Sequence, residues 1–259
     1  MKTFLFALLI VSGYTGFGQD DAFYKVKVDY AMQLNFFNTT SYKAVLHFNS
    51  TQSLFEFKEI QLEDIIKENN SGKIKEEEDG NLSFNIAMKD TTGYYYRFDK
   101  VKNETIEFVK GFSQNEFYYV IENIPAIEWI LSEEVKIIGN YSCNKANCNF
   151  RGRKYTVWYT PDIQTSFGPL KLNGLPGLIL ELSDNAKEVV LTVIAISNEN
   201  KLIETDTSKY KNISREDYKK IKKEGIESIE EIAKQVTSKM GRGMKVNVKT
   251  TGVKSIEMD

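Results

Sequence analysis

The chain has 259 residues, and its 34 lysines and arginines against 36 aspartates and glutamates give a formal net charge of −2 at pH 7. This balance argues against a nucleic-acid-binding protein, and 41% hydrophobic residues with only 4 prolines exclude a disordered or collagen-like chain. A single histidine and two cysteines are too few ligands for a structural zinc site, and we predict neither a metal nor a cofactor.

Residues 1–18 have the pattern of a secretory signal peptide. A lysine precedes the apolar run from Phe4 to Val11, and the small residues Gly16 and Gly18 end the leader. The apolar run is far shorter than the roughly 20 residues of a membrane-spanning helix, and no later stretch is as apolar. We therefore predict an exported protein, periplasmic or associated with the outer membrane, with a single domain over residues 19–259 and no transmembrane anchor.

Short apolar and aromatic segments separated by polar turns fill the first half of the mature chain, which is typical of an antiparallel sheet. Residues 61–80 are polar, with four consecutive acids from Glu76 to Asp79, and indicate a solvated loop. Strands and helices do not alternate, which argues against a doubly wound nucleotide-binding fold. The strands expected here are 23–37, 41–48, 53–58, 82–88, 94–98, 105–109 and 116–122.

The second half predicts further strands and a helix. The strands expected are 129–138, 150–160, 178–182 and 189–196. The last two are apolar along both faces, so both faces need cover. An amphipathic helix over about 214–240 would supply it, because Ser214 and Asp217 resemble a capping box and Gly241 can end the helix. The predicted fold class is α+β, mainly β: a curved, half-barrel-like antiparallel sheet with this helix packed on it.

Cys143 and Cys148 are the two cysteines of the chain. Export would place them in an oxidising compartment, so their short spacing predicts a disulfide loop at the turn between two strands. For so small a ring the expected stabilisation is only about 2 kcal/mol. A redox-active pair is the weaker interpretation, because the spacing is not C-x-x-C.

Common signatures of catalysis are missing, including G-x-S-x-G, H-E-x-x-H and the phosphate-binding loop. His47 lies in an expected strand with no nucleophile motif to serve, and we interpret it as an ordinary strand residue. Paired carboxylates can perform acid–base chemistry when their environments differ. The acidic run at 76–79 and the glutamates of the expected helix are interpreted as solvated surface instead.

The strand expected at 150–160 carries the clearest candidates for binding. Alternation places Arg151, Arg153, Tyr155 and Tyr159 on one face and Trp158 on the other. If that face is concave, the guanidinium groups and aromatic rings would meet an anionic or amphipathic ligand. A solvated edge strand is the alternative interpretation of the arginines.

The stretch from Gly174 to Ile179 reads GLPGLI. Pro176 fixes φ near −65° and Gly177 tolerates positive φ, so a type II turn is predicted to lead into the next strand. On this motif the chain resembles the GLPGLI family of exported Bacteroidota proteins, and an upstream cysteine loop, a GR-Y-x-x-WYT-P-x-I stretch and a GP step agree with that family. The matching residues are Gly152, Arg153, Tyr155, Trp158, Tyr159, Thr160, Pro161, Ile163, Gly168, Pro169, Gly174, Leu175, Pro176, Gly177, Leu178 and Ile179.

The resemblance implies no catalytic residues, and it implies an envelope role because members are often encoded beside TonB-dependent receptors. Our leading hypothesis is a non-catalytic envelope binding or accessory protein, linked to TonB-dependent uptake, that holds a ligand or partner on a concave sheet face. The partner would be an outer-membrane receptor or a small amphipathic or anionic ligand. A lipid carrier would need an apolar cavity, and a receptor accessory an exposed aromatic patch.

Two alternatives remain open from the sequence. The first is an envelope hydrolase that uses paired carboxylates, which two buried acids with raised pKa in one cleft would support. The second is a structural or assembly protein of the envelope, which would need a long unpaired edge strand or an oligomer interface.

Overall fold

The computed structural model describes residues 22–36, 39–59, 75–76, 82–83, 94–111, 116–203, 208–239 and 256–257. The predicted signal peptide and most of the loop at 61–80 lie outside these residues. The strands are β1 (Ala22–Asn35), β2 (Thr39–Phe48), β3 (Gln52–Glu59), β4 (Lys75–Glu76), β5 (Leu82–Ser83), β6 (Tyr94–Asp99), β7 (Glu104–Lys110), β8 (Phe117–Glu122), β9 (Ile130–Ile138), β10 (Tyr141–Phe150), β11 (Arg153–Thr160), β12 (Leu178–Asp184), β13 (Val189–Ile203) and β14 (Lys211–Ile213), and a helix, α2, spans Arg215–Lys239.

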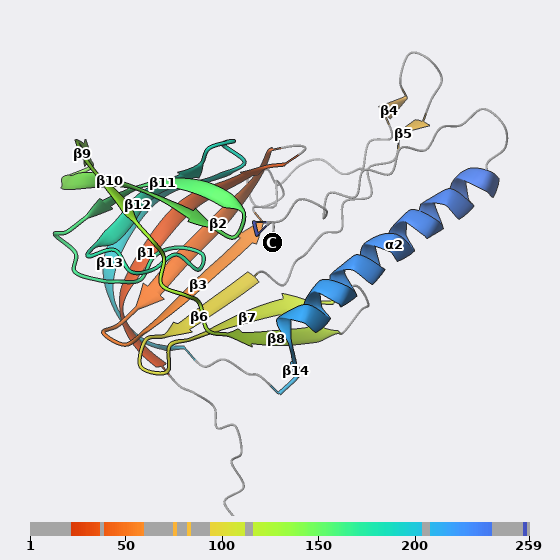
Figure 1. Cartoon of the computed structure of the whole chain (residues 1–259), viewed down its shortest axis with the longest axis horizontal. Helices are drawn as coiled ribbons and strands as arrows, with labels where there is room; N and C mark the ends of the chain where they lie inside the picture. The colour runs from red at the N-terminus through yellow and green to blue at the C-terminus, as the bar shows by residue number, and fades with distance from the viewer. Residues whose placement is uncertain are drawn as a thin grey trace, which may run out of the picture.

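Twelve strands form one open sheet in the order β14-β8-β7-β6-β3-β2-β1-β13-β12-β11-β10-β9, and β4 pairs with β5 alone. Neighbours in the large sheet are antiparallel except β14 and β8, which are parallel. Figure 1 shows the sheet curled, with β1, β2 and β3 at its centre. The prediction of a mainly β protein with a largely antiparallel sheet is confirmed.

Strand β1 shows why these residues form a sheet with one buried face. Val28, Tyr30, Met32 and Leu34 alternate along it and are all buried, because successive side chains of a strand point to opposite faces. Its register with β2 runs without a break from Val26 to Asn35, and β13 pairs with its other side. The hydrophobic core therefore lies on the inner face of the curved sheet.

The inner face is covered by residues 161–177, which connect β11 to β12 and which we name the cover segment. Its side chains Phe167, Leu170, Leu172 and Leu175 are buried in the same hydrophobic cluster as the sheet residues. The ring of Phe167 lies 6.4 Å from that of Phe48 and 5.7 Å from that of Phe98, measured between centroids. The apolar motif region thus supplies the cover that was predicted to come from the helix.

Helix α2 forms close to the predicted span but is not packed over β12 and β13. Ser214 caps it as expected, because its Oγ accepts a hydrogen bond from the Asp217 backbone N–H at 3.0 Å. Its contacts with the sheet are mainly with β8, and Figure 1 shows it running away from the sheet edge. The predicted packing is wrong because the helix is strongly polar, and the outer face of β13 stays open, with Ile194 66% exposed. Within the described residues, no helix combines the length and hydropathy needed to cross a membrane.

The predicted disulfide loop is also wrong. Cys143 and Cys148 are free and buried, and both lie on the single strand β10 rather than in a turn. Five residues along a strand separate their Cα atoms by about 16 Å. A disulfide requires Cα atoms within about 7 Å, so this strand geometry prevents the bond.

We expect two reactive thiols per chain when unreduced protein is denatured and labelled. In the native protein the alkylation at pH 8 should be slow, because burial raises the pKa of the Cys148 thiol to about 12 and leaves little thiolate. Mass spectrometry of iodoacetamide-treated samples, with and without denaturant, measures both quantities. A denatured sample that takes up no label without reductant would contradict the strand assignment of residues 141–150.

The two glycines of the GLPGLI motif have structural roles that differ from the predicted turn. Gly174 has a φ of +95°, whereas Gly177 is not in the left-handed region, so the predicted type II turn with positive φ at Gly177 is wrong. Gly177 is instead required by a close approach, because a Cβ there would lie 2.2 Å from the carbonyl oxygen of Thr160. The motif therefore brings the cover segment against the end of β11, and the Leu178 N–H donates to the Ile163 carbonyl at 3.1 Å.

Candidate functional site

The cover segment carries a buried lysine into the interior of the curved sheet. Two backbone hydrogen bonds shape its tip: the Leu172 N–H donates to the Pro169 carbonyl at 3.2 Å, and the Gly174 N–H to the Ser166 carbonyl at 2.8 Å. Lys171 lies within this tip, and its side chain is only 1% exposed. A lysine is almost never this buried unless it is paired, so its partners decide its role.

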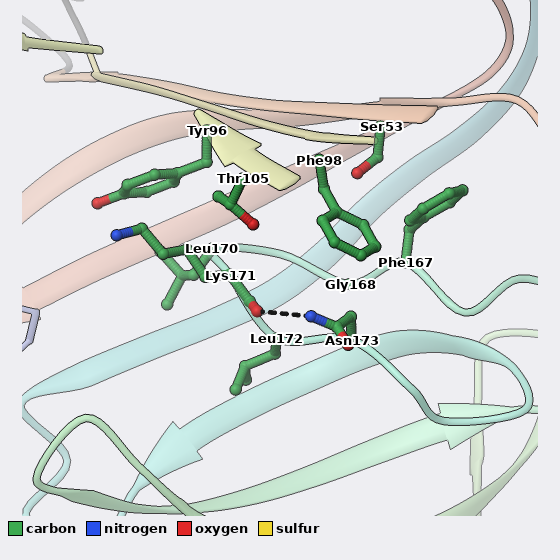
Figure 2. A pocket seen from close by; sticks show the side chains of 10 residues that line it. All are labelled: Ser53, Tyr96, Phe98, Thr105, Phe167, Gly168, Leu170, Lys171, Leu172 and Asn173. Carbon is green, nitrogen blue, oxygen red and sulfur yellow. Dashed lines mark hydrogen bonds between the residues drawn. The ribbon is translucent and has the colours of Figure 1, made fainter. Parts of the chain in front are cut away.

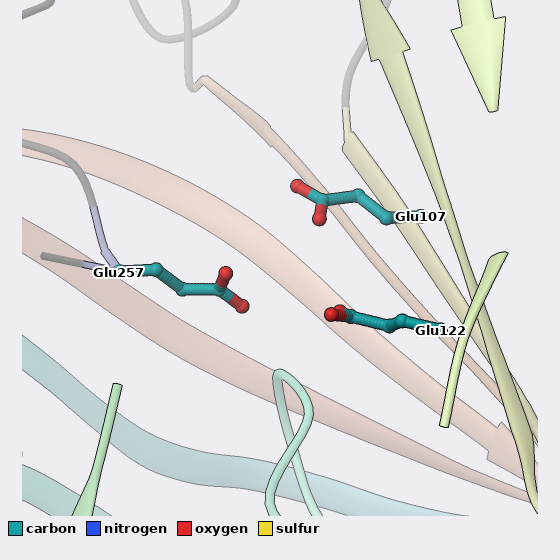
Figure 3. A group of neighbouring side chains, drawn as sticks. All are labelled: Glu107, Glu122 and Glu257. Carbon is teal, nitrogen blue, oxygen red and sulfur yellow. The ribbon is translucent and has the colours of Figure 1, made fainter. Parts of the chain in front are cut away.

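Three carboxylates surround the Lys171 ammonium. Its Nζ lies 2.5 Å from Glu107 on β7, 2.6 Å from Glu122 at the end of β8, and 2.8 Å from Glu257 of the C-terminal segment. In Figure 3, Glu107 and Glu122 point toward Glu257 from the opposite side. The tip of the cover segment, the sheet and the C-terminal residues therefore meet at one ammonium group.

Two arginines complete the arrangement, which we name the charge cluster. Arg151 donates to Glu122 at 2.6 Å from the turn between β10 and β11, a turn in which Arg151 and Gly152 both have positive φ. Arg215, the first residue of α2, pairs with Glu257 and lies 3.5 Å from Glu122. The charge cluster consists of Lys171, Arg151, Arg215, Glu107, Glu122 and Glu257.

The electrostatics of the charge cluster follow from burial and pairing. Burial raises the pKa of Glu107, and the opposing attraction of Lys171 does not offset it. Burial acts in the same direction on Glu257, but Lys171 and Arg215 outweigh it and lower that pKa. Burial alone would lower the pKa of Lys171, yet the glutamates around it raise that pKa, so the ammonium form is favoured.

The oxygens of Glu107, Glu122 and Glu257 lie within 4.8 Å of one another, which is the spacing of a carboxylate metal site. The Lys171 ammonium touches all three of them and stands where a cation would bind. The three glutamates could hold a metal only if this lysine moved away. The arrangement as it stands is an internal salt-bridge network.

The two shifted glutamates should respond to pH with opposite signs. Glu257 has a folded-state pKa below its ordinary 4.5, so its contribution to stability is present above that pH and is lost as the pH falls through the folded value. Glu107 has a raised pKa, so its contribution is present below 4.5 and is lost as the pH rises through the folded value.

We therefore compare the unfolding free energy of each variant with that of wild type at pH 3 and at pH 7. Relative to wild type, Glu257→Gln should be less stable at pH 7 than at pH 3, and Glu107→Gln should be more stable at pH 7 than at pH 3. Urea unfolding at the two pH values measures both differences. The exposed Glu227→Gln, on α2, serves as the control and should show neither trend. Equal trends for the two buried glutamates would show that the assigned charges are wrong.

The C-terminal residues Ile256 and Glu257 are held by side chains from three parts of the fold. Arg153 Nε donates to the Ile256 carbonyl at 2.9 Å, and the Tyr155 hydroxyl lies 3.5 Å from the same oxygen. Lys171 and Arg215 bind the Glu257 carboxylate, and the Ile256 side chain packs against the core. We name the four residues Arg153, Tyr155, Lys171 and Arg215 the tail clamp.

The four residues predicted to bind a ligand are all found on or beside the inner face. Arg153 is buried and pairs with Asp184 at 2.6 Å and Glu188 at 2.8 Å. Tyr155 and Tyr159 are buried in the core, and Arg151 belongs to the charge cluster. Trp158 lies on the opposite face, with the Lys136 ammonium 4.5 Å from its ring centroid.

His47 has no link to this site. Its side chain is 3% exposed, and its Nδ1 lies 2.6 Å from Glu199.

Sequence reasoning missed most of the charge cluster. Lys171 offered a local signal, because it stands between Leu170 and Leu172 in an otherwise apolar stretch. Glu107, Glu122, Arg215 and Glu257 offered none, since each is an ordinary charged residue in its own segment, and the fold alone brings them together. No local sequence pattern could place these four residues in the site.

A small pocket lies beside Lys171, and Figure 2 shows the ten side chains that line it, among them Thr105, Phe98 and Phe167. The Thr105 hydroxyl is buried there and has no hydrogen-bond partner among the described residues. Neither of the two best-formed pockets of the described residues has room for more than about one water molecule. The apolar cavity that a lipid carrier would need is therefore not supported by the part of the chain described.

The edge strand β9 presents exposed apolar side chains. Ile130, Leu131, Val135 and Ile137 are 59–69% exposed. Leu131 and Val135 pair with Ala146 and Asn144 of β10, and the other edge of β9 has no neighbour in the sheet order. Exposed apolar edge strands are places where another chain can add a strand.

Comparisons with known proteins agree with this fold and leave the function open. A family model described as a protein of unknown function, Porph_ging, matches residues 151–181 and supports a family of the Bacteroidota type. Two solved structures of PNGF-II, in space groups P21 and C2, each match with a TM-score of 0.51 and 17% identity, covering 76% and 77% of this chain but 33% and 32% of theirs. The chain thus spans about a third of PNGF-II, and the likeness shows the fold alone. No curated protein matches the sequence.

Proposed function

We propose that the chain is an exported, non-catalytic binding protein of the bacterial envelope that holds a ligand or partner segment on the concave face of its sheet. The observation that carries this proposal is the tail clamp, in which four donor side chains converge on two residues. Convergent polar groups on a rigid, mostly apolar surface are typical of binding sites. The clamp includes Arg153 and Tyr155, two of the residues that alternation placed on the binding face.

The sequence context supports an envelope role. The leader has the pattern of a signal peptide, and the GLPGLI motif with its flanks resembles exported proteins linked to TonB-dependent uptake. The family-model match covers residues 151–181, which include Arg153, Tyr155 and Lys171. On this proposal the chain is a GLPGLI-type domain over residues 19–259, and the matched region builds the inner side of its binding site.

The contacts of the carboxylates favour binding over hydrolysis. A raised pKa, as burial gives Glu107, is what a general acid requires. Each carboxylate of the charge cluster, however, forms an ion pair with the Lys171 ammonium. These carboxylates are therefore used in internal pairing instead of being directed at a substrate. We therefore keep the hydrolase as the less supported function.

Native mass spectrometry of protein purified from its own periplasm tests the proposal. We expect a non-covalent mass to be released on denaturation, or a crosslinked envelope partner, and a smaller bound fraction in Tyr155→Phe. Tyr30→Phe is the matched control, because it too loses a hydroxyl that donates to a main-chain carbonyl, that of Ile179, but outside the clamp. Absence of both a bound mass and a partner would overturn the proposal.

A second candidate function, docking of a partner strand in an envelope assembly, is favoured by the exposed apolar edge of β9. Val135→Lys should abolish crosslinking to such a partner, since charged residues protect edges against strand addition. Stability should change by less than about 0.5 kcal/mol, because the site is exposed. Ile194→Lys on β13, 66% exposed in the wild type, is the control and should leave the crosslink intact.

A further inference from the structure

The contacts of the tail clamp describe the chemistry of what it holds. Arg153 and Tyr155 contact a main-chain carbonyl through hydrogen-bond donors, and the core accepts an apolar side chain. Lys171 and Arg215 form ion pairs with a carboxylate. A free small anion would satisfy only the last of these, and a hydrocarbon chain only the second. A peptide with an apolar residue followed by a glutamate satisfies all three at once.

The charge cluster requires a carboxylate at this position. Without Glu257, the buried Lys171 ammonium and the Arg215 guanidinium would each lose a carboxylate partner. An uncompensated buried charge is costly, whereas its pairing with a carboxylate removes that cost. The clamp would therefore favour any peptide carboxylate that can take the place of Glu257.

The chain between the end of α2 and the tail clamp has more residues than the length of α2 requires it to span. Helix α2 has 25 residues and is about 37 Å long, and its first residue, Arg215, is the one that contacts Glu257. Sixteen residues, 240–255, connect the end of the helix to Ile256 and can span at most about 55 Å. The chain can thus place residues 256–257 in the clamp without being drawn tight, and nothing in its length prevents their release.

We propose that the tail clamp is a binding site for an acidic peptide segment of a partner protein, an apolar residue followed by glutamate, and that Ile256–Glu257 is its occupant in cis. This proposal rests on the proposed binding function and names its ligand. The occupant in cis competes with the partner at a high effective concentration, so the wild-type chain binds the segment weakly until the partner supplies affinity elsewhere.

The test uses the full-length chain with Glu257→Ala and an N-acetylated peptide with the sequence of residues 255–259. We expect calorimetry to show a Kd at least 10-fold lower for the variant than for wild type. A peptide with glutamine in place of the glutamate should bind the variant at least 10-fold more weakly, because Lys171 and Arg215 lose their charged partner. Glu227→Ala, at an exposed position of α2, should bind like wild type.

A second measurement covers the case in which Glu257→Ala does not fold. Saturating peptide should make the C-terminus of the wild-type chain more accessible and accelerate its digestion by carboxypeptidase, while the glutamine peptide should not.

The acidic-peptide assignment would be overturned if folded Glu257→Ala did not bind the peptide, or if the peptide did not change the digestion rate of the wild-type chain. If native mass spectrometry still finds a bound mass that Tyr155→Phe loses, the concave-face function stands with another ligand; if it finds none, both proposals fail.

Discussion

Replacing Lys171 by methionine is expected to lower the free energy of unfolding by about 3–5 kcal/mol, the usual result of removing one partner from a buried ion pair. The side chain is 1% exposed and contacts three carboxylates, so the variant leaves Glu107, Glu122 and Glu257 crowded against one another in the interior. The loss should be present at neutral pH. Urea unfolding at pH 7 measures it.

The matched control is Lys223→Met on α2, where the side chain is 78% exposed and the expected change is below about 0.5 kcal/mol. Adding Glu107→Gln to Lys171→Met should recover part of the loss, because one buried negative charge disappears. A double-mutant cycle therefore measures the coupling between the two residues. A Lys171→Met variant as stable as wild type would contradict the buried position of this side chain.

Gly177→Ala is expected to destabilise the protein by about 3 kcal/mol, the upper end for overpacking a tight site. The added Cβ would lie 2.2 Å from the Thr160 carbonyl oxygen and 2.7 Å from its carbon, and both neighbours are backbone atoms that cannot rotate away. The end of β11 and the start of β12 would have to separate. Thermal and urea unfolding of the variant measure this cost.

Gly174→Ala distinguishes a close approach from a conformational requirement in the same motif. Its φ is +95°, but the nearest atom to a Cβ is Trp129 Nε1 at 3.7 Å, so only backbone strain of about 1–2 kcal/mol is expected. The Gly177 variant should therefore be the less stable of the two. The reverse order would show that the positive φ of Gly174 matters more to stability than the close approach at Gly177.

The predictions that succeeded depended on local periodicity. Alternation identified most of the strands, though not β10 or β14, and placed Arg153, Tyr155 and Tyr159 together on the inner face. A capping pattern identified the start of α2 at Ser214. These features depend on residues a few positions apart. The binding role of the arginines and tyrosines stays a prediction that the native mass spectrometry will test.

The predictions that failed required knowledge of what lies opposite each element. An apolar strand does not show which segment covers it or whether both of its faces are covered. The inner face proved to be covered by residues 161–177 instead of the helix, and the outer face of β13 stays open. The spacing of Cys143 and Cys148 suggested a loop, although the residues between them continue one strand. Gly177 was assigned a turn conformation because its contact with Thr160 is invisible in the sequence.

The sequence by itself determined that this is a mainly β chain with an antiparallel sheet and a helix close to residues 214–240, because hydrophobic periodicity and capping are local properties. Only the tertiary structure decided that Lys171 meets Glu107, Glu122 and Glu257, which lie 64, 49 and 86 residues from it along the chain. Ion pairing depends on distance in space and on burial. Neither quantity is encoded in the spacing of charged residues along the chain.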